Sequence, residues 1–114
     1  MEIQIIKDKI SQAEIKELAR QTFGDMVKAV VDIERNIMAA GGEMHADCEQ
    51  ILLDNGSKQE DLWGANIYPD SVGENFIEYQ SLINIRPGAG NRSMEIEDEN
   101  IRNQVKCVIY SLIE

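Results

Sequence analysis

Three apolar runs in the middle of the chain, residues 26–33, 62–68 and 76–86, most restrict the fold that this sequence can adopt. Each run mixes apolar and polar side chains with a period near two, which is typical of β-strands that bury one side. The first run is rich in β-branched residues and places Val27, Val31 and Ile33 on one face. The sequence therefore predicts a sheet, which the other elements must cover.

A helix is predicted most clearly just after the first strand of the chain. Residues 2–6 alternate and indicate that short strand. Ser11 and Glu14 then have the spacing of a capping box, in which each side chain bonds the backbone of the other residue. We expect the helix to begin at Gln12 and to stop at Gly24.

Two more helices and a hairpin complete the predicted order. Residues 37–40 resume an apolar run after a short polar break, which predicts a hairpin with the strand at 26–33. Helical spacing recurs over residues 43–54 and in the last segment, up to Leu112. The predicted order is β-α-β-β-α-β-β-α within one α+β domain, residues 1–114. We expect a mixed, largely antiparallel sheet with the helices packed on one face and the other face partly open to water or to a partner.

Charge and composition disfavour several classes of partner. The formal net charge is −10, from 21 acidic and 11 basic residues, which argues against nucleic acid and anionic membrane surfaces because Lys and Arg bind both. No apolar run approaches the about 20 residues of a membrane span, and the first residues lack the pattern of a secretory signal. Cys48 and Cys107 form no Cys-x-x-Cys pair, so we expect reduced thiols in a cytoplasmic protein, with a disulfide between them as the alternative.

Several stretches of the chain have distinctive sequences. They are residues 23–32 (FGDMVKAVVD), 42–47 (GEMHAD), 56–64 (GSKQEDLWG), and 83–87 (INIRP) together with 91–93 (NRS). Together they resemble an uncharacterised family of short, single-domain prokaryotic proteins, a domain of unknown function. The resemblance covers nearly the whole chain and implies a prokaryotic cytosolic protein. It implies no activity and transfers no functional residue.

His45, the only histidine, is the first candidate for a functional site. It falls near the start of the predicted second helix, one turn before Glu49. As a general base it would need a carboxylate to orient it, and the candidates are Asp32, Asp47 and Asp61. A metal site would add Cys48 or Glu49, but such sites use three or four protein ligands, so we predict no metal. A capping or solvent-facing histidine is the structural alternative.

A glycine-rich loop ahead of the last helix is the second candidate. Arg86 ends a predicted strand, Gly88 and Gly90 allow close backbone approach, and Arg92 and Ser93 follow. Backbone N–H groups in such a loop can hold a small anion. The spacing is not that of a phosphate-binding loop, and acidic residues follow, so an ordinary turn is the alternative.

The outward face of the predicted sheet is the third candidate. Its polar side chains would meet if the strand registers align, and they are Lys28, Asp32, Asn66, Tyr68, Asn84 and Arg86. Asn has a poor strand propensity, and local misfits of this kind are more frequent at binding sites. The face is either solvated or forms a shallow polar groove. With the loop, the expected ligand-binding residues are Asn66, Tyr68, Asn84, Arg86, Asn91, Arg92 and Ser93. Trp63 is expected in the core, with an interface anchor as the alternative.

Two classes of function follow. The preferred one is a small binding or interaction protein, a homo-oligomer or a module for a small-molecule or protein partner, because the sequence has no nucleophile–base pair, ligand cluster or cofactor fingerprint. The alternative is a small hydrolase-like or transferase-like enzyme, in which His45 works with a carboxylate and Arg86 or Arg92 binds an anionic substrate. We predict no cofactor. The enzyme requires His45 and Arg86 to line one concavity within reach of a carboxylate.

Overall fold

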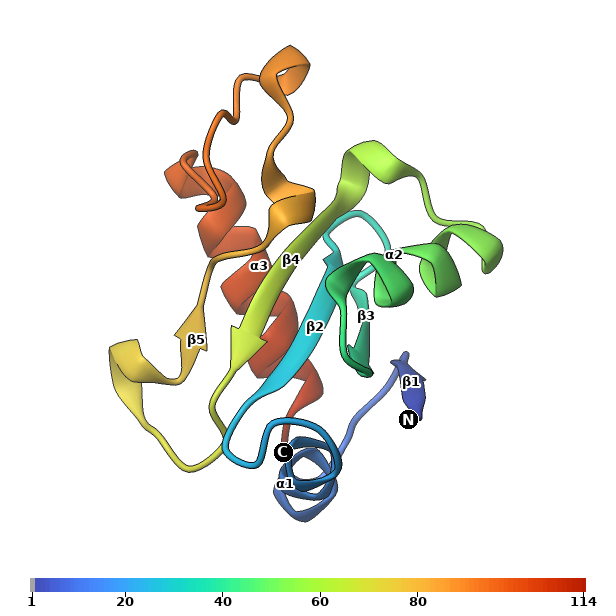
Figure 1. Ribbon diagram of the computed structural model, residues 1–114, viewed down its shortest axis with the longest axis vertical. Coiled ribbons are helices and arrows are strands. Elements are labelled where there is room, and N and C mark those ends of the chain that lie inside the picture. Colours follow the sequence, from blue (N-terminus) through green and yellow to red (C-terminus); the bar gives the residue numbers. More distant parts are fainter. Residues whose placement is uncertain (1) are drawn as a thin grey trace.

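A five-stranded sheet forms the centre of the computed structural model, which describes residues 2–114 (Figure 1). The strands lie in the order β1-β3-β2-β4-β5, and each pair of neighbours is antiparallel. Their bounds are β1 Ile3–Ile6, β2 Val27–Asp32, β3 Ile37–Gly41, β4 Leu62–Ile67 and β5 Ile77–Glu78.

Three α-helices and four short 3-10 helices connect and follow the strands. The α-helices are α1 Gln12–Gln21, α2 His45–Asp54 and α3 Glu99–Leu112. The 3-10 helices are η1 Gln59–Asp61, η2 Gly73–Asn75, η3 Leu82–Asn84 and η4 Pro87–Ala89. The predicted order of strands and α-helices and the α+β class are confirmed. None of the helices in residues 2–114 combines the length and apolar character that crossing a membrane requires.

The capping box predicted for the first helix is present. The Glu14 N–H donates to Ser11 Oγ at 3.1 Å, and the Ser11 N–H donates to the Glu14 carboxylate. The helix ends at Gln21, and the chain turns at Gly24, whose φ of +90° lies in the left-handed region. The Gly24 N–H donates to the Ala19 carbonyl at 2.8 Å, which satisfies one of the last helical carbonyls.

Helices cover both faces of the sheet, so the prediction that they pack on one face is wrong. Residues of α1 and α3 pack with Val27, Ala29 and Val31 of β2 in the larger core cluster. The α2 residues Cys48 and Leu52 pack with Val30 of β2 and with Ala39 of β3 in a second cluster. In Figure 1, α2 lies in front of the sheet and α3 passes behind it. The reason is that β3 is apolar on both faces and that Val30 of β2 adds to its second apolar face, so each face needs a cover.

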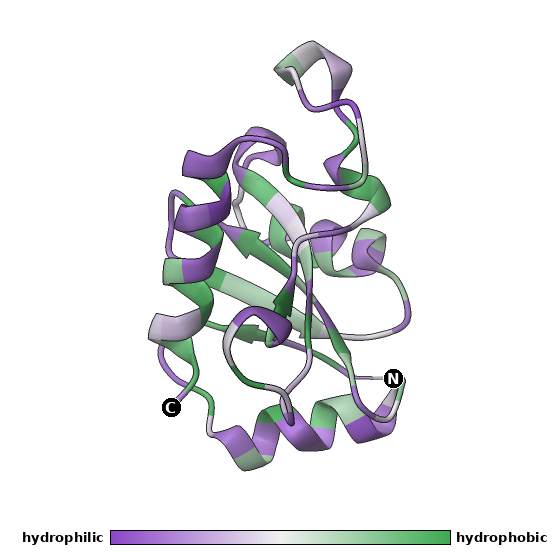
Figure 2. Cartoon of the chain, turned by 90° about the vertical axis from the view of Figure 1, so that its left-hand side faces the viewer, coloured by the Kyte–Doolittle hydropathy of each residue, from purple (hydrophilic) through white to green (hydrophobic). Residues whose placement is uncertain are grey.

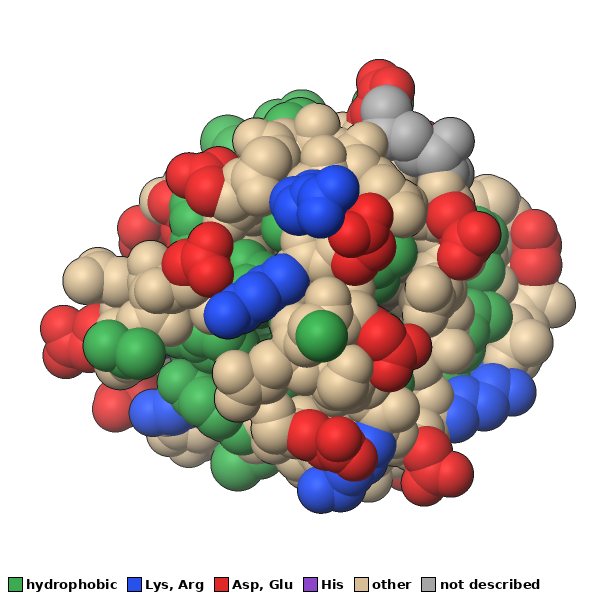
Figure 3. Space-filling model, turned by 90° about the horizontal axis from the view of Figure 1, so that it is seen from below, with side chains coloured by type: hydrophobic (Ala, Val, Ile, Leu, Met, Phe, Trp, Pro, Cys, Tyr) green, Lys and Arg blue, Asp and Glu red, His purple; other side chains and the backbone are tan. Residues whose placement is uncertain are grey.

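The amphipathic character of α3 fits its position behind the sheet. Its buried side chains are Val105, Val108, Ile109 and Leu112. Figure 2 shows a hydrophobic side of this helix toward the sheet and a hydrophilic side away from it. At the α1 end of the molecule, Figure 3 shows acidic side chains around scattered basic ones. Lys16 of α1 and Asp70 form an exposed ion pair of 3.4 Å.

The long strand predicted at residues 76–86 is mostly not a strand. Only β5 pairs with β4, and the chain then leaves the sheet and forms η3 and η4. A side chain replaces the missing strand, since the Asn84 amide accepts from the Gly64 N–H at 2.8 Å and donates to the Gly64 carbonyl at 3.0 Å. Gly64 permits this close approach, because a Cβ there would lie 2.5 Å from Ser81 Cβ. The alternation of residues 76–86 therefore reflects turns that pack against β4.

Candidate functional site

A cavity of about 340 Å³ lies between the start of α2 and η3, next to Lys28 of β2 and Asn66 of β4. We call it the α2–η3 cavity. Its walls are mainly apolar, and the side chains that matter most are Met26, Met44, Leu82, Ile83 and Met94. Its polar lining includes Lys28, His45 and Asn66. Such a mixture of apolar walls and a few convergent polar groups is typical of small-molecule sites.

The floor of the cavity is set by the register of two strands. Lys28 on β2 lies directly opposite Asn66 on β4. Directly opposite residues share one face of the sheet, with Cβ atoms about 5 Å apart. Lys28 Nζ lies 5.1 Å from the centroid of the Phe23 ring. The ion pairs of residues 2–114 do not include Lys28, so this half-buried ammonium has no carboxylate partner in the protein.

His45 reaches the same floor from the first turn of α2. Its Nε2 lies 2.9 Å from the carbonyl oxygen of Ala65, and because a carbonyl only accepts, Nε2 carries the proton. Burial lowers the pKa of His45, and the charge of Lys28 lowers it further, whereas the hydrogen bond to the Ala65 carbonyl and the polar side chain of Asn66 raise it in part. The imidazole is therefore neutral at pH 7, and Nδ1 keeps its lone pair.

Asn66 is held firmly on the other side of the floor. Its Nδ2 donates to Glu78 Oε1 at 2.8 Å and to the Gln80 carbonyl at 3.3 Å, which fixes the orientation of the amide. Its Oδ1 is buried and has no hydrogen-bond partner in the described chain. Tyr68, predicted on the same face, lies outside this cavity and donates to Glu78 Oε1 at 3.3 Å. Burial raises the pKa of Tyr68, and the charge of Glu78 raises it further.

The apolar wall of the cavity is partly uncovered. Leu82 is 70% exposed, Met44 56% and Met94 42%, although all three are large apolar side chains. They come from three segments that are distant in the sequence, the start of α2, η3 and the loop before α3. Methionine is flexible and polarisable, so a wall of this kind adapts to ligands of different shape.

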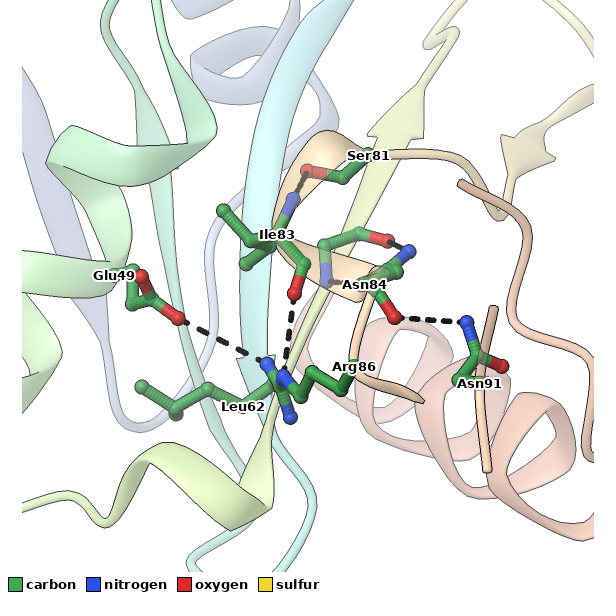
Figure 4. Close-up of polar contacts among 8 residues, drawn as sticks. Glu49, Leu62, Ser81, Ile83, Asn84, Arg86 and Asn91 are labelled. Carbon is green, nitrogen blue, oxygen red and sulfur yellow. Dashed lines mark hydrogen bonds and ion pairs between the residues drawn. The ribbon is translucent and has the colours of Figure 1, made fainter. Parts of the chain in front are cut away.

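Arg86 lies beside the cavity rather than in it, and it ties the two walls together (Figure 4). Its Nη2 donates to the Leu62 carbonyl, and its Nε donates to the Ile83 carbonyl at 3.2 Å. The guanidinium lies 3.8 Å from Glu49 Oε2 on α2 and 4.7 Å from the centroid of the buried Trp63 ring. Burial lowers the pKa of Arg86, and the Glu49 carboxylate raises it in part.

Asn84 and Asn91 have structural roles in the loop that forms the outer wall. Both residues are buried. Besides its two bonds to Gly64, Asn84 donates to the Met94 carbonyl at 3.1 Å. Asn91 donates to the carbonyls of Asn84 and Glu95, each at 2.8 Å, and accepts from the Glu97 N–H at 2.8 Å. Their amides are used to fold the segment that carries Leu82 and Met94.

The backbone N–H groups predicted to hold an anion are occupied by the chain itself. The N–H groups of Arg92 and Ser93 both donate to Glu97 Oε2 at 2.8 Å. These bonds, the one from Arg92 first, lower the pKa of Glu97. The loop thus binds an internal carboxylate at the position where a free anion was expected.

The structure does not bring the candidate carboxylates to His45. Asp32 is buried and accepts from the N–H groups of Glu34 and Arg35 at 2.9 Å and from Ser57 Oγ at 2.7 Å, which stabilises the β2–β3 turn. It lies four residues along β2 from Lys28, a distance of about 13 Å. Asp61 lies at the Asp32 end of β2, where its backbone carbonyl accepts from the Ile33 N–H. Asp47 is exposed on α2.

Residues 2–114 contain no group of His, Cys, Asp and Glu side chains that could hold a metal ion. The sequence interpretation did find Lys28 and Asn66 together on one face of the sheet, but it treated His45 as a separate candidate. It missed the apolar walls, because the positions of Met44, Leu82 and Met94 carry no periodic signal. The one available signal was an apolar residue at the N-cap of α2, Met44, which makes no capping hydrogen bond.

The fold and the cavity define a small α+β protein with an amphipathic site on the side of the sheet that α2 covers only in part. Residues 4–112 match the family described as "Protein of unknown function (DUF5674)", and the chain belongs to this family. This agrees with the resemblance to a domain of unknown function. No curated protein and no solved structure matches the chain.

Proposed function

We propose that this protein binds a small molecule that has an anionic group and an apolar body, and that the α2–η3 cavity is its site. The observation that carries the proposal is the unpaired Lys28 ammonium at the floor of an apolar cavity. Lys28 is the lysine that lines this cavity, and it forms no ion pair with the described residues, so it is available to a ligand. A cavity of about 340 Å³ also lies within the range of small-molecule sites.

Partial burial of Lys28 makes a carboxylate a suitable partner. A fully exposed ion pair contributes about 0–1 kcal/mol, because water and salt screen it. Inside a cavity with apolar walls the effective dielectric is lower, so the same pair is stronger once the ligand has covered it. Lys28 is half-buried, and a carboxylate beside it would offset part of the cost of covering its charge with a ligand.

The apolar wall would contact the apolar body of the ligand. Leu82, Met44 and Met94 expose large apolar surfaces that a ligand would cover, at about 25 cal/mol for each Å² removed from water. The hydrogen bonds of Asn84 and Asn91 and the Arg86–Glu49 contact hold both walls in place before the ligand arrives. A preformed wall reduces the entropy that binding must overcome.

The geometry of His45 supports a binding role over the enzyme alternative. The ring donates to a backbone carbonyl, whereas a general base is normally oriented by a carboxylate. Arg86, the proposed anchor for an anionic substrate, is used by carbonyls and by Glu49 and does not line the cavity. We also infer a cytoplasmic location, which the unpaired thiols of Cys48 and Cys107 support.

The test uses 4-methylpentanoate and its uncharged analogue 4-methylpentanamide in thermal unfolding and calorimetry. At about ten times its Kd a ligand stabilises the folded state by about 1.4 kcal/mol, which raises Tm by about 5 °C in a chain of this size. We expect that rise with the carboxylate and a much smaller one with the amide. Lys28→Met should abolish the difference, and the matched control Lys106→Met, an exposed lysine of α3, should keep it.

A second copy of the chain is the competing occupant of the apolar wall. Light scattering and the variant Leu82→Glu separate the two cases. A dimer that Leu82→Glu converts to a monomer, together with no shift from either small molecule, would overturn the proposal in favour of a homo-oligomer. A monomer with a carboxylate-specific shift that depends on Lys28 supports it.

A further inference from the structure

We infer that the ligand of the α2–η3 cavity carries a neutral hydrogen-bond donor next to its anionic group, as a 2-hydroxy carboxylic acid with an apolar side chain does. The inference rests on the proposed function and specifies the chemical class of the ligand. It comes from the polar groups on the floor, which offer one cation and acceptors rather than several donors.

The first acceptor is Nδ1 of His45. The hydrogen bond to the Ala65 carbonyl assigns the proton to Nε2, so Nδ1 is the unprotonated nitrogen of a neutral ring. The ring lines the cavity, and no side chain or backbone group of residues 2–114 donates to Nδ1. A ligand hydroxyl can donate a hydrogen bond to Nδ1, whereas a carboxylate oxygen would be repelled by the Nδ1 lone pair.

The second acceptor is Oδ1 of Asn66, which is buried and without a donor. The amide cannot rotate to present its NH₂ group to a ligand instead, because Nδ2 is committed to Glu78 and Gln80. Asn66 lines the cavity together with His45, whose Nε2 bonds the carbonyl of the neighbouring residue Ala65. The side of the floor opposite Lys28 is therefore rich in acceptors.

The register of β2 and β4 places the cation and the acceptors on one small floor. Lys28 and Asn66 are directly opposite, with Cβ atoms about 5 Å apart. One small molecule can therefore present a carboxylate to Lys28 and a donor to the acceptor side. A hydroxyl on the carbon next to the carboxylate is the simplest such donor.

The charge of Lys28 selects a neutral donor over a cationic one. An amino acid places an ammonium in the position of the 2-hydroxyl, and that ammonium would approach the unpaired Lys28 charge. Two positive charges in one small cavity repel each other, and the apolar walls strengthen the repulsion. A hydroxyl donates the hydrogen bond without this cost, so hydroxy acids should bind in preference to the amino acids of the same shape.

The experiment compares three ligands of one shape by calorimetry: 2-hydroxy-4-methylpentanoate, 4-methylpentanoate and leucine. We expect the hydroxy acid to bind about tenfold tighter than the deoxy acid, the usual effect of one additional hydrogen bond. Leucine should bind more weakly than either. His45→Phe, which keeps a ring but removes the acceptor, should remove the difference in affinity between the hydroxy acid and the deoxy acid. Lys28→Met should weaken both acids by the same factor.

The outcomes separate this inference from the proposed function. Equal affinities of the two acids for the wild-type protein, or tighter binding of leucine, would overturn the inference and leave the proposed function standing. If none of the three ligands binds, both are overturned. The comparison in the wild-type protein decides the matter even if His45→Phe does not fold, which circular dichroism would reveal.

Discussion

Replacing Asn84 by alanine should destabilise the protein far more than the loss of one surface amide. The change removes the acceptor for the Gly64 N–H and the donor to the Gly64 carbonyl, at 2.8 and 3.0 Å. Asn84 is fully buried, so water does not replace its amide directly. A buried backbone group left without a partner costs about 1–3 kcal/mol, so the two groups together cost about 3 kcal/mol.

That loss is a large part of the stability of a domain of this size, which is about 5–15 kcal/mol. It corresponds to a fall in Tm of about 12 °C. Urea and thermal unfolding measure the change, and the exposed Asn103→Ala on α3 is the matched control. If Asn84→Ala and Asn103→Ala differ by less than about 0.5 kcal/mol, the Asn84 amide does not substitute for a strand, and this account of the edge of β4 is wrong.

Three further predictions concern pH, thiol reactivity and packing. The folded protein holds the pKa of His45 below 6.5, so on acidification the unfolded chain binds a proton first. The free energy of unfolding should therefore be highest above pH 6.5 and fall as the pH drops below it. In urea unfolding from pH 7.5 to 5.5, His45→Phe should lack the part of this pH dependence that His45 contributes. Burial raises the pKa of the Cys48 thiol to about 12, so a thiol reagent should modify only Cys107 in the folded protein and both in urea; two rapid modifications in the folded state would contradict this. Gly64→Ala places a Cβ 2.5 Å from Ser81 Cβ and should lower the free energy of unfolding by about 1–3 kcal/mol; unchanged stability would contradict the close packing.

Local signals in the sequence predicted much of the fold. Ser11 and Glu14 located the start of α1, because a capping box depends only on residues within one turn. The period of two placed Lys28 and Asn66 on one face of the sheet, and their register then brought them opposite each other. The element order followed from the same patterns.

The errors arose where contacts between distant segments decide the structure. Val30 lies on the face that the sequence analysis left partly open to water or to a partner, and α2 packs on that face. Residues 76–86 alternate between apolar and polar side chains as a strand does, so the sequence pattern could not exclude a strand. The contact that replaces the strand is made by the side chain of Asn84, which bonds the backbone of β4. The cavity walls come from three separate segments, so no local pattern predicts that Met44 and Leu82 meet.

The pairing of Asn84 with Gly64 also bears on aggregation. The free edge of a sheet can recruit a strand from another molecule and so start a polymer. Along the Leu62–Gly64 part of β4, the Arg86 guanidinium and the Asn84 amide already occupy the backbone groups that such a recruit would need. Any fibril or strand-swapped dimer that grows by extension of this sheet should therefore not start along this part of β4, and the edge strands β1 and β5 are the places where a recruit could pair.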